Sequence, residues 1–367
     1  MKKKILVIIT TDFVPFGGLT TVMMNYYRKI NKDFFQIDFA STNSDIDKNL
    51  ISELENNASR YYCLGNRKKR PISYAVRLNR LLRNNSYDIV HINSNSATAF
   101  IELYIASKSG IAKRIVHNHT SKCNHIWVHK LLFPFFKNAY TDAIACSKKA
   151  GEWIFLNDNY TILNNGIDTE KYRYNSNRRS EIRALYKIEE DCVLIGHLGK
   201  IYEPKNHVFL IDIFYQYHIL NPNSKLMLVG DGELRSQIEK KVESLNLEKY
   251  VIFTGMQTDA YKFLSAMDVF VFPSIWEGMP LSVIEAQASG LSCLVSNRID
   301  ETVKVTESLE FHSIDNGIDE WVDALQLRTK IDRNISSQEN IEMIKRNNFD
   351  IQTNVSKLED IYRGINQ

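Results

Sequence analysis

The segment from Phe272 to Gly290 holds the densest group of residues that could do chemistry. An apolar run ends at Phe272, and Pro280 suits the first position of a helix, where its missing N–H costs nothing. The amides of Leu281 and Ser282 would then lie at a helix N-terminus, where N–H groups without intrahelical partners attract phosphate. The segment therefore predicts an anion site.

Two glutamates flank this predicted helix start. Glu285 lies one turn into the helix, within reach of a ribose beside a bound phosphate. Glu277 precedes the helix on the loop and is expected to point toward the ligand. The spacing alone carries little weight, because Glu181 and Glu189 are also eight residues apart without similar surroundings. The alternative for Glu277 is an acid that only stabilises the helix dipole.

Four histidines raise the question of a metal. His117 and His119 lie on one face of a predicted strand, and His125 and His129 are four residues apart on a possible helix. A zinc site is conceivable, but no cysteine or carboxylate stands at ligand spacing. We therefore expect no metal and interpret His117 as a buried histidine whose nitrogens are satisfied by hydrogen bonds.

Asp45 and Asp47 formally match a DxD metal motif. They lie in a polar, helix-like stretch, and we interpret them as solvated surface.

The order of the motifs resembles the retaining glycosyltransferases of family 4, which have the GT-B architecture. The matching segments are Phe272–Ala286 with the later Gly290, Gly199–His207, Asn165–Asp168, Val229–Gly232, Phe253–Gly255, Gly17–Gly18 and His119–Ser121. The match covers most of the chain and is strongest from 193 to 296. It implies two doubly wound domains, retention at the anomeric carbon and no obligatory metal or other cofactor, since the nucleotide-sugar is a substrate.

The resemblance implies that Lys200 and Lys205 hold the diphosphate of the donor, whose negative charge grows as it leaves. One cation about 4 Å from an oxyanion, at an effective dielectric of about 20, is worth on the order of 4 kcal/mol before desolvation. The family usually has arginine where Lys200 stands, so this chain offers a point charge without a bidentate fork. The alternative is a pair of solvated surface lysines.

The other implied roles belong to residues that meet the sugars. Glu277 would contact the hydroxyls of the donor hexose, helped by the amides of Gly278 and Met279, and would stabilise positive charge at the anomeric carbon. Glu285 would accept hydrogen bonds from both ribose hydroxyls. His119 would bond a sugar hydroxyl or the reacting centre. The predicted catalytic residues are Glu277, Lys205, Lys200 and His119.

Gly17 and Gly18 let the backbone approach a ligand closely and open a predicted helix over Leu19–Ile30, whose amides could meet a diphosphate or an acceptor phosphate. The alternative is a plain turn. The resemblance adds Gly199 and Met256 to the donor contacts. The predicted donor-binding residues are Gly17, Gly18, Gly199, Met256, Gly278, Met279, Leu281, Ser282 and Glu285.

Along the chain, short apolar runs alternate with longer amphipathic stretches. The elements that these runs and stretches form must position the predicted catalytic and donor-binding residues. The runs cover residues 5–9, 35–40, 61–64, 88–93, 114–119, 143–147 and 160–163, then 193–198, 225–229, 251–254, 269–272 and 292–295. Strands that alternate with helices predict an α/β fold with parallel sheets covered on both faces. Ligands bind beyond the carboxyl ends of such strands.

We predict two Rossmann-like domains that face each other across a cleft, which is the expected site. An acceptor-side domain spans residues 1–172 and a nucleotide-sugar-binding domain spans 173–350. A C-terminal helix over 351–367 is expected to pack back on the first domain. The boundary rests on a turn at Asn164–Asp168 and on the polar, weakly periodic stretch Tyr172–Glu190.

The composition is that of a globular protein, with 44% hydrophobic and 24% charged residues in 367. The start of the chain imitates a signal peptide, but its apolar part, Ile5–Ile9, is shorter than the roughly 7–15 residues expected. Five scattered cysteines without a CxxC pair suit reduced thiols, and we expect a cytoplasmic protein.

The charge is uneven, with 27 Lys and Arg against 14 Asp and Glu through Ser180, and 19 against 29 after it. The basic cluster Arg67, Lys68, Lys69 and Arg70 and the segment 126–140 suggest peripheral contact with the anionic inner face of the cell membrane. Pro134 predicts a kinked or two-part element there. The alternatives are a core helix with exposed lysines and a solvated surface without a partner. Nucleic acid is disfavoured, because aromatic and basic residues are not interleaved on a recognisable module.

These features together predict a retaining hexosyltransferase that uses a nucleotide-diphosphate sugar, with UDP as the family's frequent choice. The resemblance implies a front-side mechanism in which the leaving phosphate takes the acceptor's proton. The acceptor is expected to be a sugar or lipid-linked oligosaccharide of capsule or exopolysaccharide synthesis. The alternatives are a GT-B sugar-nucleotide epimerase or phosphorylase, and a non-catalytic binding protein.

Overall fold

The structure is a computed structural model that describes residues 2–15, 17–123, 125–156, 159–327 and 332–365. It divides into two units, residues 1–166 with 351–367 and residues 167–350. The division falls after Gly166, earlier than the expected boundary at 172, because the polar stretch that follows forms two helices of the second unit. Residues 366–367, the end of the predicted C-terminal helix, lie outside the described residues.

The first unit is built on a parallel sheet in the order β3-β2-β1-β4-β5-β6-β7. Its strands are β1 (Lys3–Ile9), β2 (Phe35–Ser41), β3 (Tyr61–Cys63), β4 (Ile89–Ser94), β5 (Lys113–Asn118), β6 (Asp142–Ala145) and β7 (Thr161–Ile162). Its helices are α1 (Gly18–Lys29), α2 (Lys48–Glu55), α3 (Pro71–Asn84), η1 (Ala97–Ala99), α4 (Phe100–Lys108), α5 (Ile126–Phe136), α6 (Lys148–Phe155) and α15 (Ile351–Arg363). The strands predicted in this half of the sequence are all present.

The second unit has a parallel sheet in the order β10-β9-β8-β11-β12-β13. Its strands are β8 (Val193–Leu198), β9 (Ser224–Val229), β10 (Val251–Gly255), β11 (Val269–Phe272), β12 (Ser292–Ser296) and β13 (Leu309–His312). Its helices are α7 (Thr169–Tyr172), α8 (Ser176–Leu185), η2 (Glu203–Lys205), α9 (His207–Leu220), α10 (Arg235–Ser244), α11 (Ala260–Ala266), α12 (Leu281–Ala288), η3 (Glu301–Val303), α13 (Asp319–Leu327) and α14 (Arg333–Arg346). The predicted α/β class with two Rossmann-like sheets is confirmed.

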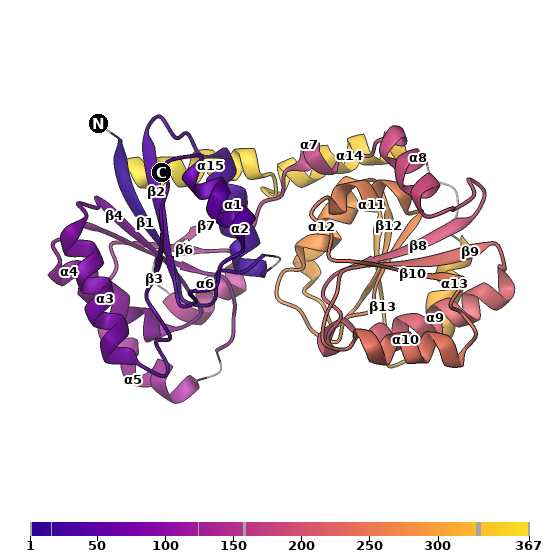
Figure 1. The fold of residues 1–367 in the computed structure, drawn as a ribbon, viewed down its shortest axis with the longest axis horizontal. Helices are drawn as coiled ribbons and strands as arrows, with labels where there is room; N and C mark the ends of the chain where they lie inside the picture. Colours follow the sequence, from indigo (N-terminus) through magenta and orange to yellow (C-terminus); the bar gives the residue numbers. More distant parts are fainter. Residues whose placement is uncertain (1, 16, 124, 157–158, 328–331, 366–367) are drawn as a thin grey trace. The chain divides into compact units, whose positions relative to one another are not determined.

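Helices cover both faces of the second sheet (Figure 1). Phe270 and Phe272 of β11 pack in the core beneath α8, α11, α12 and α14. Val269 and Val271 of the same strand point into the core beneath α9, α10 and α13. Burial on both faces explains why these strands appear in the sequence as continuous apolar runs.

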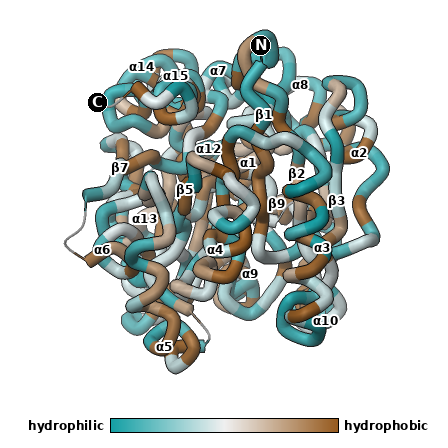
Figure 2. Tube along the Cα trace, turned by 90° about the vertical axis from the view of Figure 1, so that its left-hand side faces the viewer, coloured by the Kyte–Doolittle hydropathy of each residue, from teal (hydrophilic) through white to brown (hydrophobic). Residues whose placement is uncertain are grey.

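Helix α5 is largely hydrophobic along its tube in Figure 2. It forms one helix of 11 residues, so the two-part form of the predicted kinked or two-part element is wrong. Pro134 lies in its last turn, where a proline removes a hydrogen bond only from the helix end. Across the described ranges, none of the helices combines the length and apolar character needed to span a bilayer.

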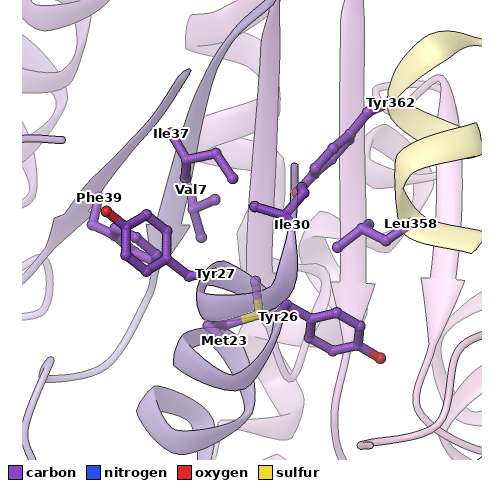
Figure 3. A pocket seen from close by; sticks show the side chains of 9 residues that line it. All are labelled: Val7, Met23, Tyr26, Tyr27, Ile30, Ile37, Phe39, Leu358 and Tyr362. Atoms are coloured by element: carbon purple, nitrogen blue, oxygen red, sulfur yellow. The ribbon is translucent and has the colours of Figure 1, made fainter. Parts of the chain in front are cut away.

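The C-terminal helix α15 belongs to the first unit and packs beside α1 (Figure 3). Lys3 Nζ donates to the carbonyl oxygens of Tyr362 at 3.0 Å and Arg363 at 3.2 Å, at the end of the helix. Leu358 and Tyr362 are fully buried and line a small apolar cavity with Tyr26 of α1. Burying a large apolar side chain contributes about 1.5–3 kcal/mol, so core packing holds α15 on this unit.

Candidate active site

The second sheet reverses its strand order at β8, which lies between β9 and β11. The chain leaves β8 toward β9 on one side and later returns through β11 on the other. In open parallel sheets this switch point, at the carboxyl ends of the strands, is where ligands bind. The loops that follow β8 and β11 hold most of the predicted catalytic residues.

Lys205 and Glu277 face each other across these two loops. Lys205 Nζ lies 2.8 Å from Glu277 Oε1, and the two side chains are 10% and 15% exposed. The ammonium also lies 4.2 Å from the ring centroid of Phe272, a cation–π distance. Burial lowers the pKa of Lys205, and Glu277 partly offsets this effect. Two residues with separate predicted roles therefore form one nearly buried ion pair.

Main-chain geometry fixes the position of Lys205. It ends the short turn η2, and Asn206 follows with a left-handed φ of 56°, which asparagine tolerates better than most residues. Asn206 Nδ2 donates to the carbonyl of Pro273 at 3.2 Å, and the amide of Ile275 donates to the carbonyl of Pro204 at 2.8 Å. These bonds join the loop after β8 to the loop after β11.

Gly199 leaves the space that the Lys205 side chain occupies. A Cβ at Gly199 would lie 3.0 Å from Lys205 Cε and 3.4 Å from His197 Nε2. Gly230, at a φ of 140°, allows an even closer approach, because a Cβ there would clash with the carbonyl oxygen of Gly199. In this structure Gly199 acts through packing around the lysine.

Two histidines that the sequence analysis did not single out pack around Lys205. The rings of His197 and His207 lie 4.7 Å apart, and His197 Nδ1 donates to the carbonyl of Val271 at 2.8 Å. Burial and then Lys205 lower the pKa of His207 to about 4, and burial likewise lowers that of His197. Both rings are therefore neutral near pH 7, and they leave Lys205 and Glu277 as a charged pair in an apolar setting.

Lys200 has a different environment from Lys205. Its ammonium lies 2.8 Å from Glu233 Oε2, and both side chains are more than half exposed. Tyr202, also missed by the sequence analysis, lies beneath this pair, with Lys200 Nζ 5.5 Å from its ring centroid. Burial, with Glu277 and Glu233 nearby, raises the pKa of Tyr202 to about 12, and its side chain is hydrogen-bonded to Glu277. Tyr202 thus lies between the two ion pairs.

Helix α12 begins at Leu281, with Pro280 as its N-cap. Leu281 and Ser282 are half-buried in its first turn, where backbone amides have no intrahelical acceptor. Gly278 is exposed, and Met279 is half-buried against the core. The predicted donor residue Met256 follows β10 at the same edge of the sheet and is exposed.

Glu285 lies in α12 and is only 7% exposed. Burial raises the pKa of its carboxyl to about 7, although a hydrogen bond from Tyr172 and the charge of Lys171 oppose the rise. Both opposing residues belong to α7, which packs against α12. Glu285 therefore lies in the helix that carries the free amides. Its pKa of about 7 means that its carboxyl is partly protonated near neutral pH.

In the first unit, Gly17 and Gly18 form the start of α1. Gly17 is the N-cap with extended backbone angles, and its amide donates to the carbonyl of Val14 at 3.2 Å. A Cβ at Gly18 would meet no atom within 4 Å. The N-terminus of α1 is therefore open on the side of Gly18.

His119 follows β5 and lies between two asparagines. Its Nε2 is 2.8 Å from Oδ1 of Asn93, and its Nδ1 is 3.3 Å from Oδ1 of Asn165. Its ring packs on His117 with a centroid distance of 4.0 Å. Burial lowers the pKa of His119 to about 4. His117 is fully buried, as expected, but the expectation that its nitrogens would be hydrogen-bonded is wrong among the described residues, because neither has a partner.

Asp47 and His129, two of the candidate metal residues, have other hydrogen-bond partners. Asp47 caps α2 by accepting the amides of Asn49 and Leu50, and His129 Nδ1 accepts the amide of Ala97 at 3.1 Å. Within the ranges that the structure describes, no group of three histidine, cysteine, aspartate or glutamate side chains could hold an ion.

The basic cluster 67–70 requires a correction. Arg67 does not point outward: its Nη1 lies 3.1 Å from Oε1 of the fully buried Glu102, and its Nη2 donates to the carbonyl of Thr98 at 2.9 Å. A buried carboxylate needs this cation, so Arg67 is not available to a membrane. Lys68, Lys69 and Arg70 are exposed, and Arg67 anchors them beside α4.

In comparisons with known proteins, each half of the chain matches a glycosyltransferase family model. The family model described as glycosyltransferase family 4 matches residues 16–171, and the model described as glycosyl transferases group 1 matches residues 178–347. EpsF of Bacillus subtilis (strain 168), by its name a glycosyltransferase, is 30% identical over 363 residues, which cover 94% of this chain and 93% of that protein.

Two further comparisons agree. An Escherichia coli protein named as a UDP-Gal:alpha-D-GlcNAc-diphosphoundecaprenol alpha-1,3-galactosyltransferase is 30% identical, and the match covers 78% of each chain. The crystal structure of Anabaena HepE in complex with UDP and glucose has the same fold, with a TM-score of 0.76 at 16% identity over 99% of this chain and 100% of that one.

Proposed function

Because this chain belongs to glycosyltransferase family 4 and is a hexosyltransferase of GT-B architecture, we propose that it transfers a hexose, with retention, from a UDP-sugar to a lipid-linked acceptor in surface polysaccharide synthesis. The observation that carries the proposal is the ion pair of Lys205 with Glu277 at the strand switch point.

The leaving diphosphate would compete with Glu277 for Lys205. As the glycosidic bond lengthens, negative charge collects on the phosphate oxygens, and a nearly buried ammonium stabilises it more than an exposed one would. When Lys205 turns to the phosphate, the Glu277 carboxylate is free to accept hydrogen bonds from hexose hydroxyls. The amides at the start of α12 supply further donors to the phosphate.

UDP is supported by the donor named for the Escherichia coli relative. Glu285 would accept hydrogen bonds from both ribose hydroxyls in its ionised form, which is about half populated near pH 7. The acceptor hydroxyl would attack from the face that the phosphate leaves, and a phosphate oxygen would take its proton. No base of the protein is required in this scheme, and His119 would bond a sugar hydroxyl.

A lipid-linked acceptor is supported by the diphosphoundecaprenol in the name of the same relative. Helix α5 carries the matching surface: Trp127, Leu131 and Phe135 are 81%, 70% and 59% exposed and recur every four residues. Lys130 and Lys137 are exposed on the same segment. An apolar stripe with flanking lysines suits an anionic membrane surface, and we propose peripheral binding through α5 on the cytoplasmic face.

The test is an assay of the purified protein with UDP-, GDP- and ADP-hexoses, each with and without an undecaprenyl-diphosphate-sugar acceptor. The proposal predicts that a UDP-hexose raises the melting temperature and that a glycosidic product forms only with the acceptor. A changed sugar in the donor alone would identify an epimerase, and dependence on inorganic phosphate would identify a phosphorylase. No conversion of any donor, with acceptor present, would contradict transfer.

A further inference from the structure

The surroundings of His119 determine which ring nitrogen carries its proton. Both nitrogens face amide oxygens, Nε2 that of Asn93 at 2.8 Å and Nδ1 that of Asn165 at 3.3 Å. An amide oxygen only accepts hydrogen bonds. Both contacts together would therefore require two N–H groups, which only a charged imidazolium has.

A charged ring conflicts with the groups packed behind it. His119 lies against His117, and His117 stacks on His91 at a centroid distance of 5.4 Å. Both neighbours are fully buried, and neither nitrogen of His117 has a hydrogen-bond partner among the described residues. Burial lowers the pKa of each of the three rings, so none of them takes up a second proton near pH 7. His119 is therefore neutral.

A neutral ring has one N–H and one lone pair, so one amide must present its NH2 group instead of its oxygen. Asn93 Nδ2 also points to the carbonyl of Ile8, at 3.4 Å, which keeps its oxygen toward Nε2. Asn165 has the longer contact, and turning its amide exchanges oxygen for nitrogen in the same space.

We infer that Asn93 and Asn165 are positioning residues that hold His119 as the neutral Nε2–H tautomer, with the Nδ1 lone pair as a hydrogen-bond acceptor. Behind the stack, Tyr362 of α15 bonds His91 Nδ1 at 2.7 Å and completes the support of the rings. The consequence for catalysis rests on the proposed function: a sugar hydroxyl donates to Nδ1 and replaces the longer contact with Asn165.

Nuclear magnetic resonance of the full chain, labelled with 15N-histidine at pH 7.5, tests the assignment. The His119 signals are those that disappear in His119→Gln. We expect a pyrrole-type shift for Nε2 and a pyridine-type shift for Nδ1. A protonated Nδ1, with or without a proton on Nε2, would overturn the inference.

Two substitutions at Asn93 separate positioning from folding. Asn93→Leu removes the acceptor, and the His119 shifts should move toward the average of the two tautomers, with a fall in kcat of about tenfold, the worth of one hydrogen bond. Asn93→Asp keeps an acceptor, so it should restore the Nε2–H shifts and move the acidic limb of the pH–rate profile to higher pH. Unchanged His119 shifts in Asn93→Leu would refute the role of Asn93.

The control is Asn340→Leu, which removes a buried amide of the second unit that bonds the carbonyl of Gln287. Its His119 shifts should match those of the unsubstituted protein. If the shifts behave as expected while His119→Gln transfers sugar at the full rate, the tautomer assignment stands and the part of His119 in the proposed function fails.

Discussion

At the scale of single residues, the site depends on groups whose ionisation burial has altered. Lys205 is held nearly buried beside Glu277, while the neighbouring His197 and His207 are neutral. A cation in this setting is costly without a partner. In the proposed function, exchange of Glu277 for a phosphate would keep Lys205 paired throughout the reaction.

Replacing either member of the pair should abolish most of the activity. Lys205→Ala and Glu277→Ala should each lower kcat by at least about 10²-fold, because each removes a charge needed at the departing bond. The control is Lys240→Ala, an exposed lysine of α10, which should transfer sugar normally. Steady-state kinetics with circular dichroism of each variant measures this, and near-normal turnover in either site variant would disprove the assigned roles.

Glu285 should reduce stability at alkaline pH. Its pKa is about 7 in the folded protein and about 4.5 when unfolded, so the folded state binds the extra proton in between. Stability therefore falls as pH rises through this window, by on the order of 3 kcal/mol. Glu285→Gln should raise the urea midpoint at pH 8 and weaken UDP binding, with less loss for 2′-deoxy-UDP. A lower midpoint at pH 8 would contradict this account.

The buried histidines should reduce stability at acidic pH, whereas Glu285 reduces it at alkaline pH. The pKa values of His119 and His207 are lowered to about 4 and that of His91 to about 3, against 6.5 when unfolded. In this range the unfolded chain binds protons on these histidines and the folded chain does not. The free energy of unfolding should therefore fall as the pH drops from about 6.5 to 4. Urea unfolding across this range measures the loss. Substitution of the exposed His125 by glutamine should leave the slope unchanged, whereas a stability independent of pH would refute the buried neutral rings.

At the scale of elements, α5 presents an apolar face that the first unit does not cover. His129 and Phe136 face inward, and Trp127, Leu131 and Phe135 face outward. The exposed Lys68, Lys69 and Arg70 are tied through Arg67 to α4, which packs against α5. Apolar and basic groups therefore gather around one helix.

Leu131→Glu should weaken binding to vesicles of phosphatidylglycerol by roughly tenfold, because a carboxylate replaces an inserted side chain and repels anionic lipid. Leu185→Glu, at a similarly exposed leucine of α8, is the matched control and should bind as before. Co-sedimentation measures both. Equal binding of the two variants, or no binding of the unsubstituted protein, would contradict a membrane role for α5.

The sequence predicts the positions of the helices and strands better than the side-chain contacts between them. Strands such as β1, β8 and β11 were predictable because burial on both faces makes them continuous apolar runs. Leu309–His312 escaped because β13 is a short edge strand in which half-buried residues interrupt the apolar pattern. The inward turn of Arg67 toward Glu102 and the placement of Tyr202 beside Glu277 depend on contacts between distant segments, which no local pattern encodes.

At the scale of the whole molecule, the first unit is assembled from two distant parts of the chain. Residues 351–367 return to residues 1–166, while the second unit is continuous. Helix α15 buries Leu358 and Tyr362 in the first unit, and Tyr362 reaches the histidine stack through His91. The end of the chain thus contributes to a unit that is otherwise complete by Gly166.

Leu358→Ala should therefore destabilise the first unit alone, by about 2–5 kcal/mol for a buried leucine. Hydrogen exchange should show faster exchange in β1, α1 and α15, and unchanged protection in β8 and β11. The stabilisation produced by UDP should persist, since Lys205, Glu277, Glu285 and the start of α12, which the proposed function assigns to the donor, lie in the second unit. Loss of protection throughout the second unit would show that the two units unfold together.

The most direct test of the central claim is a crystal structure of the protein with a non-hydrolysable UDP-hexose analogue. The account predicts Lys205 Nζ within hydrogen-bond distance of a phosphate oxygen, and Glu277 on the hexose hydroxyls beside the start of α12. A structure in which the diphosphate is bound elsewhere, with Lys205 still paired to Glu277, would contradict it.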